Sequence, residues 1–264
     1  MRENALKKLW REDKPALGGW LSIPSSYSAE AMSQVGLDWL CIDMQHGAIG
    51  YQAAVEMLQA ISTTRTVPIV RVPWNDPAMI MKMLDAGAYG IIIPLINTRA
   101  DAEAAVAACR YPPIGMRSFG PNRAVFYGGA DYFAHANEEI LCIPMIETAP
   151  AMRGLDDILS VPGVDACYIG PMDLSLALGV RPVMDGDEPA YVEARQKIVE
   201  ACRRHGVIAG INSTSSTAPA RITDGFRFVL VTSDVGSMAR NALQELRGVR
   251  EAAPGQVGAG PAYQ

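Results

Sequence analysis

The stretch PIVRVPWNDPAMIMKMLDAGAYGIIIPLI, residues 68–96, contains two short apolar runs separated by an amphipathic segment. The runs at 68–73 and 90–96 are apolar nearly throughout, which is typical of strands buried on both faces of a parallel sheet. The segment at 75–87 has a polar cap, a proline in its first turn and a glycine at its close, so it predicts a helix. A strand, a helix and a second strand in this order indicate an alternating α/β fold.

The same alternation runs along the rest of the chain. Strands are expected at 18–24, 39–43, 68–73, 90–96, 141–147, 166–170, 207–212 and 226–232. Helices are expected at 28–36, 51–64, 75–87, 99–110, 149–159, 189–206 and 234–253. Eight strands alternating with helices predict an α/β protein with a (β/α)8 TIM barrel, a fold of about 250 residues. A doubly wound open sheet is the alternative, but no glycine-rich nucleotide loop follows any strand.

The composition excludes several classes of protein. Hydrophobic residues make up 49% of the 264 residues and charged residues 19%, which supports a large core. The net charge is −5 and the sequence has no basic block, so it lacks the positively charged surface typical of nucleic-acid-binding proteins. The five cysteines form no CxxC pair, so neither a disulfide framework nor a zinc site is predicted. There is no hydrophobic signal region and no membrane-spanning run, so a cytoplasmic protein is expected.

A simple domain organisation is expected. Residues 1–16 form a charged, helical N-terminal extension, residues 17–253 a single barrel domain and residues 254–264 a flexible tail rich in proline, glycine and alanine. The segment at 111–140 interrupts the alternation of strands and helices. Long insertions of this kind in compact domains are often functional.

Two carboxylates follow neighbouring strands of the predicted barrel. Glu147 ends the fifth strand and Asp173 lies in the turn after the sixth, and chemistry in such barrels gathers at this end of the strands. Two close carboxylates resist ionising together unless a cation lies between them, and carboxylate oxygens suit Mg²⁺ or Mn²⁺. The alternative is that each carboxylate caps a nearby helix. Both together are better explained by a divalent metal site.

Two further polar groups occupy the same end of the barrel. Arg71 lies within an apolar strand, where an arginine needs an anionic partner: a protein carboxylate, or a substrate carboxylate or enolate oxygen. His46 follows the second strand close to Asp43, which could fix the tautomer of its imidazole and raise its basicity. His46 is therefore a candidate proton acceptor.

The lysines exclude one kind of carbanion chemistry. None of the five ends a predicted strand, because three precede the first strand and two lie in predicted helices. An aldolase that works through a Schiff base needs a lysine in its pocket. If this chain handles carbanions, a metal must serve as the electron sink.

Six segments carry a resemblance to a known family: WLSIPSSYSAE, DWLCIDMQHG, VRVPWNDPAMIMKMLDAG, YPPIGMRSFG, MIETAPAM and YIGPMDLSLALG. The chain resembles the HpcH/HpaI aldolases, which are class II, metal-dependent pyruvate aldolases of the 4-hydroxy-2-oxoheptanedioate and 2-keto-3-deoxy-sugar-acid type. The match runs from about residue 17 to residue 245. The resemblance implies a (β/α)8 barrel whose last helix is exchanged between subunits, in a homo-oligomer that is a hexamer built as a trimer of dimers.

The resemblance also implies roles for individual residues. Glu147 and Asp173 would bind a divalent cation (Mg²⁺, Mn²⁺ or Co²⁺) that chelates pyruvate. Arg71 would stabilise the enolate oxygen and His46 would act as the base or proton shuttle. Asp43 would orient the site, and Asp85 of a neighbouring subunit would pair with the histidine. The remaining residues implied in substrate binding are the backbone around Gly170, Met172 and Asp173, the hydroxyl of Ser175, and Gln45.

The chain departs from the family at one position and is ambiguous at another. The family usually has glutamate where this chain has Gln45, which keeps the shape and the hydrogen bonds but removes a charge. The change is expected to alter metal preference or pH optimum if that residue tunes the metal. Arg123, in the insertion, either faces the incoming aldehyde or is an ordinary surface arginine.

The expected activity is the reversible cleavage of 4-hydroxy-2-oxo acids into pyruvate, or a related 2-oxo acid such as hydroxypyruvate, and an aldehyde, through an enolate held by the metal. Such an activity would serve the catabolism of aromatic compounds or sugar acids. The alternatives are a citramalyl- or malyl-CoA lyase and, less favoured, a barrel that binds 2-oxo acids without turning them over. The sequence does not identify the aldehyde, the preferred metal or the stereochemistry.

Overall fold

The computed structural model describes residues 1–253, and its eight strands are all parallel. They pair in the order β5-β4-β3-β2-β1-β8-β7-β6, and an isolated bridge between Met145 and Tyr168 joins the two ends of this sheet. The sheet is therefore closed, which confirms the barrel and excludes the open doubly wound sheet. The strands are β1 (Ala16–Leu21), β2 (Trp39–Asp43), β3 (Val67–Arg71), β4 (Gly90–Ile93), β5 (Leu141–Pro144), β6 (Ala166–Ile169), β7 (Ile208–Ile211) and β8 (Phe228–Ser233).

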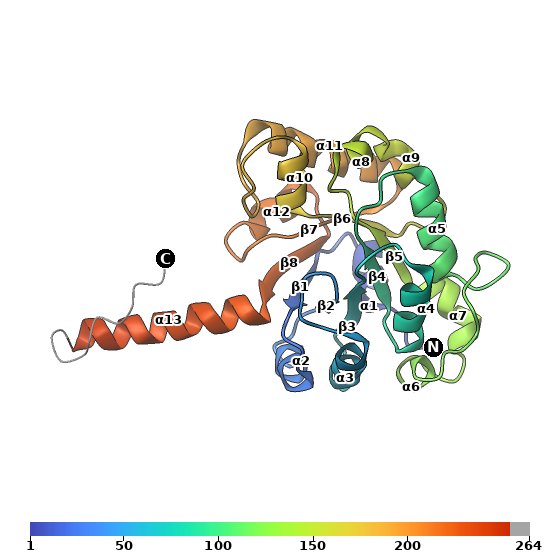
Figure 1. Ribbon diagram of the computed structural model, residues 1–264, viewed down its shortest axis with the longest axis horizontal. Coiled ribbons are helices and arrows are strands. Elements are labelled where there is room, and N and C mark those ends of the chain that lie inside the picture. Colours follow the sequence, from blue (N-terminus) through green and yellow to red (C-terminus); the bar gives the residue numbers. More distant parts are fainter. Residues whose placement is uncertain (254–264) are drawn as a thin grey trace.

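Helices surround the barrel on its outside, as Figure 1 shows. They are α1 (Ala5–Arg11), α2 (Ser26–Ser33), α3 (Tyr51–Ile61), α4 (Pro77–Asp85), α5 (Arg99–Cys109), α6 (Ala124–Gly128), α7 (Tyr132–Glu139), α8 (Ala149–Arg153), α9 (Leu155–Leu159), α10 (Pro171–Ala177), α11 (Pro189–His205), α12 (Ala218–Asp224) and α13 (Asp234–Ala252).

The βαβ unit at 68–96 is built as its residues predict. The side chain of Asp76 caps α4 by accepting a hydrogen bond from the amide of Ala78, and Pro77 occupies the first turn. Gly87 follows the helix with a φ of +107°, a left-handed backbone that favours glycine, and the chain then enters β4.

Aromatic side chains fill the interior of the barrel. Trp20, Trp39, Tyr168 and Phe228 come from four different strands, and the rings of Trp39 and Phe228 lie 4.1 Å apart. Gly18 on β1 leaves room for this packing, because a Cβ atom there would lie 2.0 Å from the indole of Trp39. This aromatic layer forms the floor beneath the polar residues at the carboxyl ends of the strands.

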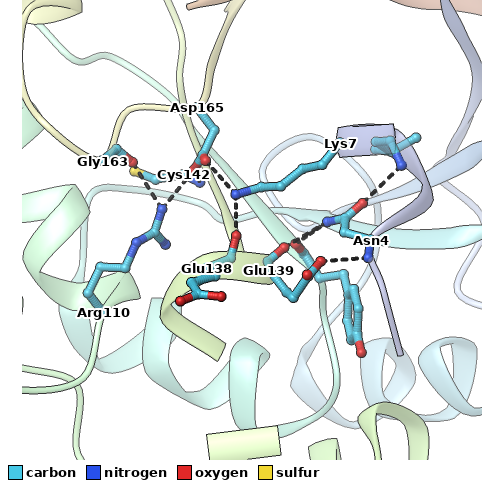
Figure 2. A network of polar contacts seen from close by, with 10 residues as sticks. Asn4, Lys7, Arg110, Glu138, Glu139, Cys142, Gly163 and Asp165 are labelled. Carbon is cyan, nitrogen blue, oxygen red and sulfur yellow. Dashed lines mark hydrogen bonds and ion pairs between the residues drawn. The ribbon is translucent and has the colours of Figure 1, made fainter. Parts of the chain in front are cut away.

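A polar network anchors α1 at the other end of the barrel (Figure 2). Lys7 and Arg110 both pair with Asp165, at 2.8 and 2.7 Å, just before β6. Asn4 caps α1 and its side chain also donates a hydrogen bond to the carbonyl of Glu139, which ends α7. The amino-terminal helix is therefore held to the barrel by the Lys7–Asp165 ion pair and by the hydrogen bond of its capping residue Asn4 to Glu139.

The last helix leaves the barrel. In Figure 1, α13 extends away from the rest of the chain, and its contacts with the barrel are at β1 and β8. Its exposed apolar side chains are Val235, Met238, Leu243, Leu246 and Val249. Exchange of this helix with another copy of the chain remains a prediction. Within residues 1–253, no helix has the length and apolar character needed to cross a membrane.

Several helices differ from expectation. The helix expected at 149–159 is two short helices, α8 and α9, which are separated at Gly154. The turn expected after β6 is the helix α10, and α12 was not expected from the sequence. The predicted flexible tail, residues 254–264, lies outside the described residues, and the predicted boundary between residues 16 and 17 remains a prediction.

Candidate active site

Asp43 and Arg71 form a buried ion pair between the ends of β2 and β3. The two residues are register partners in the parallel ladder. The carboxylate accepts hydrogen bonds from Nε of Arg71 at 2.9 Å and from Nη2 at 2.7 Å. Such a two-pronged contact fixes the plane of the guanidinium as well as its position. Arg71 therefore has a protein partner, one of the two possibilities raised by its place in an apolar strand.

The ion pair stabilises both charges. Burial alone would raise the pKa of Asp43, but the hydrogen bonds and charge of Arg71 outweigh it and lower that pKa below its ordinary value. Burial would lower the pKa of Arg71, but the bonds and charge of Asp43, with a contribution from Glu147, raise it. The arginine is a permanent cation, and its guanidinium also lies 4.8 Å from the centre of the Trp20 ring.

Glu147 is a buried carboxyl group with an unusual environment. It follows β5 and is 2% exposed. Its Oε1 accepts a hydrogen bond from the amide of Leu95, which has a φ of +55°. Burial, reinforced by the charge of Asp173, raises the pKa of Glu147 to about 7, against the lowering effects of the Leu95 amide and of Arg71. The alternative that Glu147 caps a helix is not observed, since Thr148 caps α8.

Gly170 makes room for the second oxygen of this carboxylate. A Cβ atom at Gly170 would lie 2.6 Å from Oε2 of Glu147, so a larger residue would displace the carboxylate. Gly170 is also the N-cap of α10, whose first turn carries Asp173. Asp173 is the third residue of this helix and is exposed. Because α10 follows β6 and Glu147 follows β5, both carboxylates lie at the carboxyl end of the barrel.

The donor set suits a hard divalent cation. Glu147 and Asp173 supply carboxylate oxygens, and residues 1–253 contain no cluster of three or more histidine, cysteine, aspartate or glutamate side chains able to hold a metal. The two carboxylates leave positions for water and substrate oxygens, which is how Mg²⁺ and Mn²⁺ are usually bound. Ionising Glu147 is unfavourable because the carboxyl group is buried and lies near the charge of Asp173. A bound cation would reduce this cost.

Gln45 and His46 follow Asp43 in the chain, but their contacts with its carboxylate differ from the predicted ones. The carboxylate of Asp43 accepts hydrogen bonds from the backbone amides of both residues, at 3.0 and 3.2 Å. The expected pairing of Asp43 with the imidazole of His46 is not observed, because Arg71 and these amides occupy the carboxylate. The imidazole is exposed. Oε1 of Gln45 is buried and, within the described chain, has no hydrogen-bond partner.

Asp85 lies far from His46 of the same chain. It ends α4, five residues before β4 starts, and therefore lies at the amino end of the barrel. Its Oδ1 accepts a hydrogen bond of 2.8 Å from Arg117, a fully buried residue of the insertion. Asp85 therefore does not pair with His46 of the same chain, and its pairing with a histidine of another subunit remains a prediction.

Arg123 is also engaged at the amino end of the barrel. Its guanidinium donates to the carbonyl of Ala86 and to the hydroxyl of Ser62, at the ends of α4 and α3. These contacts connect the insertion to two helix carboxyl ends, where a cation is favourable. They do not point Arg123 toward an aldehyde bound in the same subunit.

Near Asp173, the structure changes the expected set of substrate contacts. The hydroxyl of Ser175 donates its one hydrogen to the carbonyl of Pro171, at 2.7 Å, and the side chain is buried. The Ser175 hydroxyl is therefore already engaged within the chain, and its contact with substrate remains a prediction. The amides of Met172 and Asp173 belong to the first turn of α10, whose N–H groups have no partner within a helix.

Sequence reasoning missed two residues of the site. Trp20 covers one face of the Arg71 guanidinium, and the only signal was an aromatic residue near the end of the first strand. Leu95 supplies the amide that binds Glu147 through a left-handed backbone. No sequence pattern predicts a leucine with a left-handed backbone, because this conformation is rare for residues other than glycine.

The chain is similar to known aldolases along most of its length. A family model described as HpcH/HpaI aldolase/citrate lyase matches residues 17–241. The hydroxypyruvate/pyruvate aldolase of Rhizorhabdus wittichii is 41% identical over 251 residues, covering 94% of this chain and 99% of that protein. The 2-dehydro-3,6-dideoxy-6-sulfogluconate aldolase of Pseudomonas putida is 38% identical over 240 residues, covering 89% and 92%. A solved structure of a HpcH/HpaI aldolase/citrate lyase family protein from Burkholderia cenocepacia has a TM-score of 0.86 at 34% identity, covering 94% of this chain and 99% of that one.

The environment of Glu147 predicts how metal-free protein responds to pH. Because its pKa is about 7 in the folded protein, against an ordinary value of 4.5, folding favours the protonated form. The contribution of Glu147 to stability is therefore fully present below pH 4.5 and is lost as pH rises through 7. Glu147→Gln should stabilise the metal-free protein by roughly 2–3 kcal/mol at pH 8 and by much less at pH 4.5.

Urea unfolding in the presence of chelator, at pH 4.5, 6, 7 and 8, measures this difference. The matched control is Glu103→Gln, an exposed position on α5, which should change the unfolding free energy by less than about 0.5 kcal/mol at every pH. A Glu147→Gln effect that is the same at pH 4.5 and pH 8 would contradict the raised pKa.

Proposed function

This chain belongs to the HpcH/HpaI aldolase/citrate lyase family, and from that premise we propose how its site cleaves 4-hydroxy-2-oxo acids into a 2-oxo acid and an aldehyde. It is a class II aldolase, a carbon–carbon lyase. The proposed 2-oxo acid is pyruvate or hydroxypyruvate, which the name of the Rhizorhabdus wittichii relative includes. The observation that carries the proposal is that the buried carboxyl group of Glu147, Asp173 in the first turn of α10 and the guanidinium of Arg71 all lie at the carboxyl end of the barrel.

Glu147 and Asp173 are proposed to hold one divalent cation, Mg²⁺, Mn²⁺ or Co²⁺. When bound, the cation would polarise the keto group of the substrate as a Lewis acid. Glu147 would bind it through Oε2, since Oε1 already accepts the amide of Leu95. Gly170 keeps the space around Oε2 open.

Arg71 is proposed to stabilise the negative charge that develops on the substrate's keto oxygen during bond cleavage. Nε and one hydrogen of Nη2 are occupied by Asp43, which leaves Nη1 and the second Nη2 hydrogen as donors. Asp43 and Trp20 hold the guanidinium in place, so these donors need no rearrangement when the charge appears. Asp43 thus acts by positioning Arg71.

His46 is the proposed base for the C4 hydroxyl. It would remove the hydroxyl proton, the C3–C4 bond would break, and the electron pair would move onto the keto oxygen as the aldehyde leaves. Protonation of the resulting enolate at C3 gives the 2-oxo acid. The exposed position of the imidazole allows it to reach substrate and solvent. Gln45, with its unpaired Oε1, is a proposed acceptor for a substrate or water hydroxyl.

The substrate carboxylate is proposed to lie against the first turn of α10. The amides of Met172 and Asp173 have no partner within the helix and can donate to an anion there. Pro171 has no N–H to offer, and the Ser175 hydroxyl is already used. The backbone therefore supplies this contact.

The two rival functions have less support. A CoA-ester lyase of the citramalyl or malyl type is not favoured, because the relatives from Rhizorhabdus wittichii and Pseudomonas putida, which match 94% and 89% of the chain, are named aldolases. A non-catalytic binder would be expected to lack a carboxylate of the pair or the arginine. All three residues are present: Arg71 ends β3, Glu147 follows β5 and Asp173 lies in the first turn of α10.

The proposed assembly rests on α13 and Asp85. The helix carries a row of exposed apolar side chains beyond its contacts with β1 and β8, and a second copy of the chain could cover them. Asp85 is proposed to reach His46 of a neighbouring subunit, with Arg117 holding one of its oxygens. The full assembly proposed is a hexamer, a trimer of dimers. Arg123 is proposed to approach the aldehyde only across such an interface.

Metal dependence is the first test of the function. Chelator-treated protein should release no pyruvate from a racemic 4-hydroxy-2-oxo acid, and Mg²⁺, Mn²⁺ or Co²⁺ should restore the release, measured by coupling to lactate dehydrogenase. Asp173→Asn should abolish the restored activity and weaken Mn²⁺ binding in calorimetry. Turnover of a CoA thioester but of no hydroxy-oxo acid would favour the lyase, and pyruvate binding without turnover would favour the binder.

Arg71→Lys tests the proposed charge stabilisation. A lysine keeps the positive charge but cannot bind Asp43 through two parallel hydrogen bonds while also donating to the substrate. We expect kcat to fall about 10²-fold or more, with a smaller change in KM, because the contact strengthens as the enolate forms. Arg99→Lys, an exposed arginine on α5, is the matched control and should leave kcat unchanged. A loss confined to KM would contradict this role.

A charge on α13 tests the proposed assembly. The double variant Met238→Glu and Leu246→Glu introduces two charges among the exposed apolar residues and should reduce the oligomer to smaller species. Light scattering during size-exclusion chromatography measures the mass, with Glu245→Gln on the same helix as the control. An unchanged mass for the double variant would show that this face of α13 lies outside the interface.

A further inference from the structure

Two buried cysteines touch each other outside the proposed active site. The structure contains five free cysteines, and all of them are buried. The sulfur atoms of Cys167 and Cys202 lie 3.2 Å apart. Their side chains are 0% and 1% exposed. No step of the aldol reaction uses either thiol.

The fold itself brings these two residues together. On β6, Tyr168 points into the barrel and joins the aromatic layer with Trp20 and Trp39, so its neighbour Cys167 points outward, toward the helices. Helix α11 covers this side of the barrel and buries its residues at the spacing of one helical face, ending with Cys202. Strand and helix thus hold the two sulfur atoms face to face.

A cavity leads to this pair. It has a volume of about 230 Å³ and Cys202 is part of its wall. Val199, Arg203 and Val207 line it beside the cysteine, and Arg227 contributes at its edge. The cavity is large enough for a molecule such as hydrogen peroxide, because a water molecule occupies about 30 Å³. Because Cys202 lines this cavity and Cys167 does not, we assign Cys202 as the first of the two thiols to react.

We propose that Cys167 and Cys202 are a dithiol that hydroperoxides convert to a disulfide between β6 and α11. Cys202, as its thiolate, attacks one peroxide oxygen, the O–O bond breaks, and with one proton the products are a sulfenic acid and water. Cys167, as its thiolate, then attacks the sulfenic sulfur, forming the S–S bond and releasing hydroxide, which takes up a proton to become the second water. The two thiols lose two electrons, which reduce one hydroperoxide.

The chemistry of the site makes this oxidation slow. The contact with Cys167 and burial together raise the pKa of Cys202 well above its ordinary value, so little thiolate is present at neutral pH. The thiolate is the reactive form, and a high pKa limits the rate of its oxidation. The pair is therefore expected to respond to sustained oxidant and to stay reduced otherwise.

A disulfide here would close a covalent ring that contains Asp173, one of the two proposed metal ligands, and leaves Glu147 outside it. The chain between Cys167 and Cys202 includes Gly170, Asp173 and α10. It also includes Asp185, a buried carboxylate that pairs with Arg195 of α11. Closing the ring would tether both ends of this segment and restrict its unfolded state, which raises stability.

The experiment uses the full-length protein, reduced and then incubated with hydrogen peroxide at neutral pH. We expect most of the protein to lose two hydrogen atoms in intact mass. A digest without reductant should contain one peptide that joins Cys167 to Cys202, and dithiothreitol should remove it. The oxidised protein should also unfold at a higher temperature than the reduced protein. None of these measurements depends on aldolase activity.

Single variants test the pairing. Cys202→Ala and Cys167→Ala should each prevent the cross-link, and Cys109→Ala, at another buried cysteine, should leave it intact. The wild-type digest decides the question even if a variant fails to fold. Retention of both thiols, sulfinic acid without a cross-link, or a disulfide that joins other cysteines would each overturn the proposal.

Discussion

The ion pair between Asp43 and Arg71 is the constraint on which the rest of the site depends. It joins register partners at the ends of adjacent strands, inside a barrel whose interior is otherwise aromatic and aliphatic. Removing one partner of such a pair costs about 3–5 kcal/mol, because the other charge is left buried without compensation. Asp43 also accepts the amides that begin the loop of Gln45 and His46. One carboxylate thus positions the Arg71 guanidinium and the start of the loop that carries the proposed base.

The charges at the carboxyl end of the barrel would favour the divalent cation proposed to bind there. Asp43 neutralises Arg71, so Glu147 and Asp173 have no full countercharge among their protein neighbours, and burial raises the pKa of Glu147. A larger residue at Gly170 would not reduce this electrostatic cost, because its side chain would collide with Oε2 of Glu147. This arrangement of two carboxylates is unfavourable in the metal-free protein and would be stabilised by a bound cation.

The sequence predicted the barrel and most of the site, for physical reasons that are local. Apolar runs such as 39–43 coincide with observed strands, and the ends of those strands located Asp43, Arg71 and Glu147. Side-chain partners were harder to predict, because they depend on the register between strands. Asp43 pairs with its register partner Arg71 and not with the imidazole of His46. Arg123 could not be located from the sequence, since its partners at Ser62 and Ala86 meet only after the insertion folds against the barrel.

The position of Trp20 gives this protein an internal optical probe. Its indole ring lies 4.8 Å from the guanidinium of Arg71 and is almost completely buried. The emission of an indole depends on the electric field across the ring, and Arg71 is the group proposed to meet the substrate's oxygen. An anion that arrives at that guanidinium changes the field at Trp20. Binding is therefore expected to change the part of the intrinsic fluorescence that comes from Trp20, one of four tryptophans, without a label and without turnover.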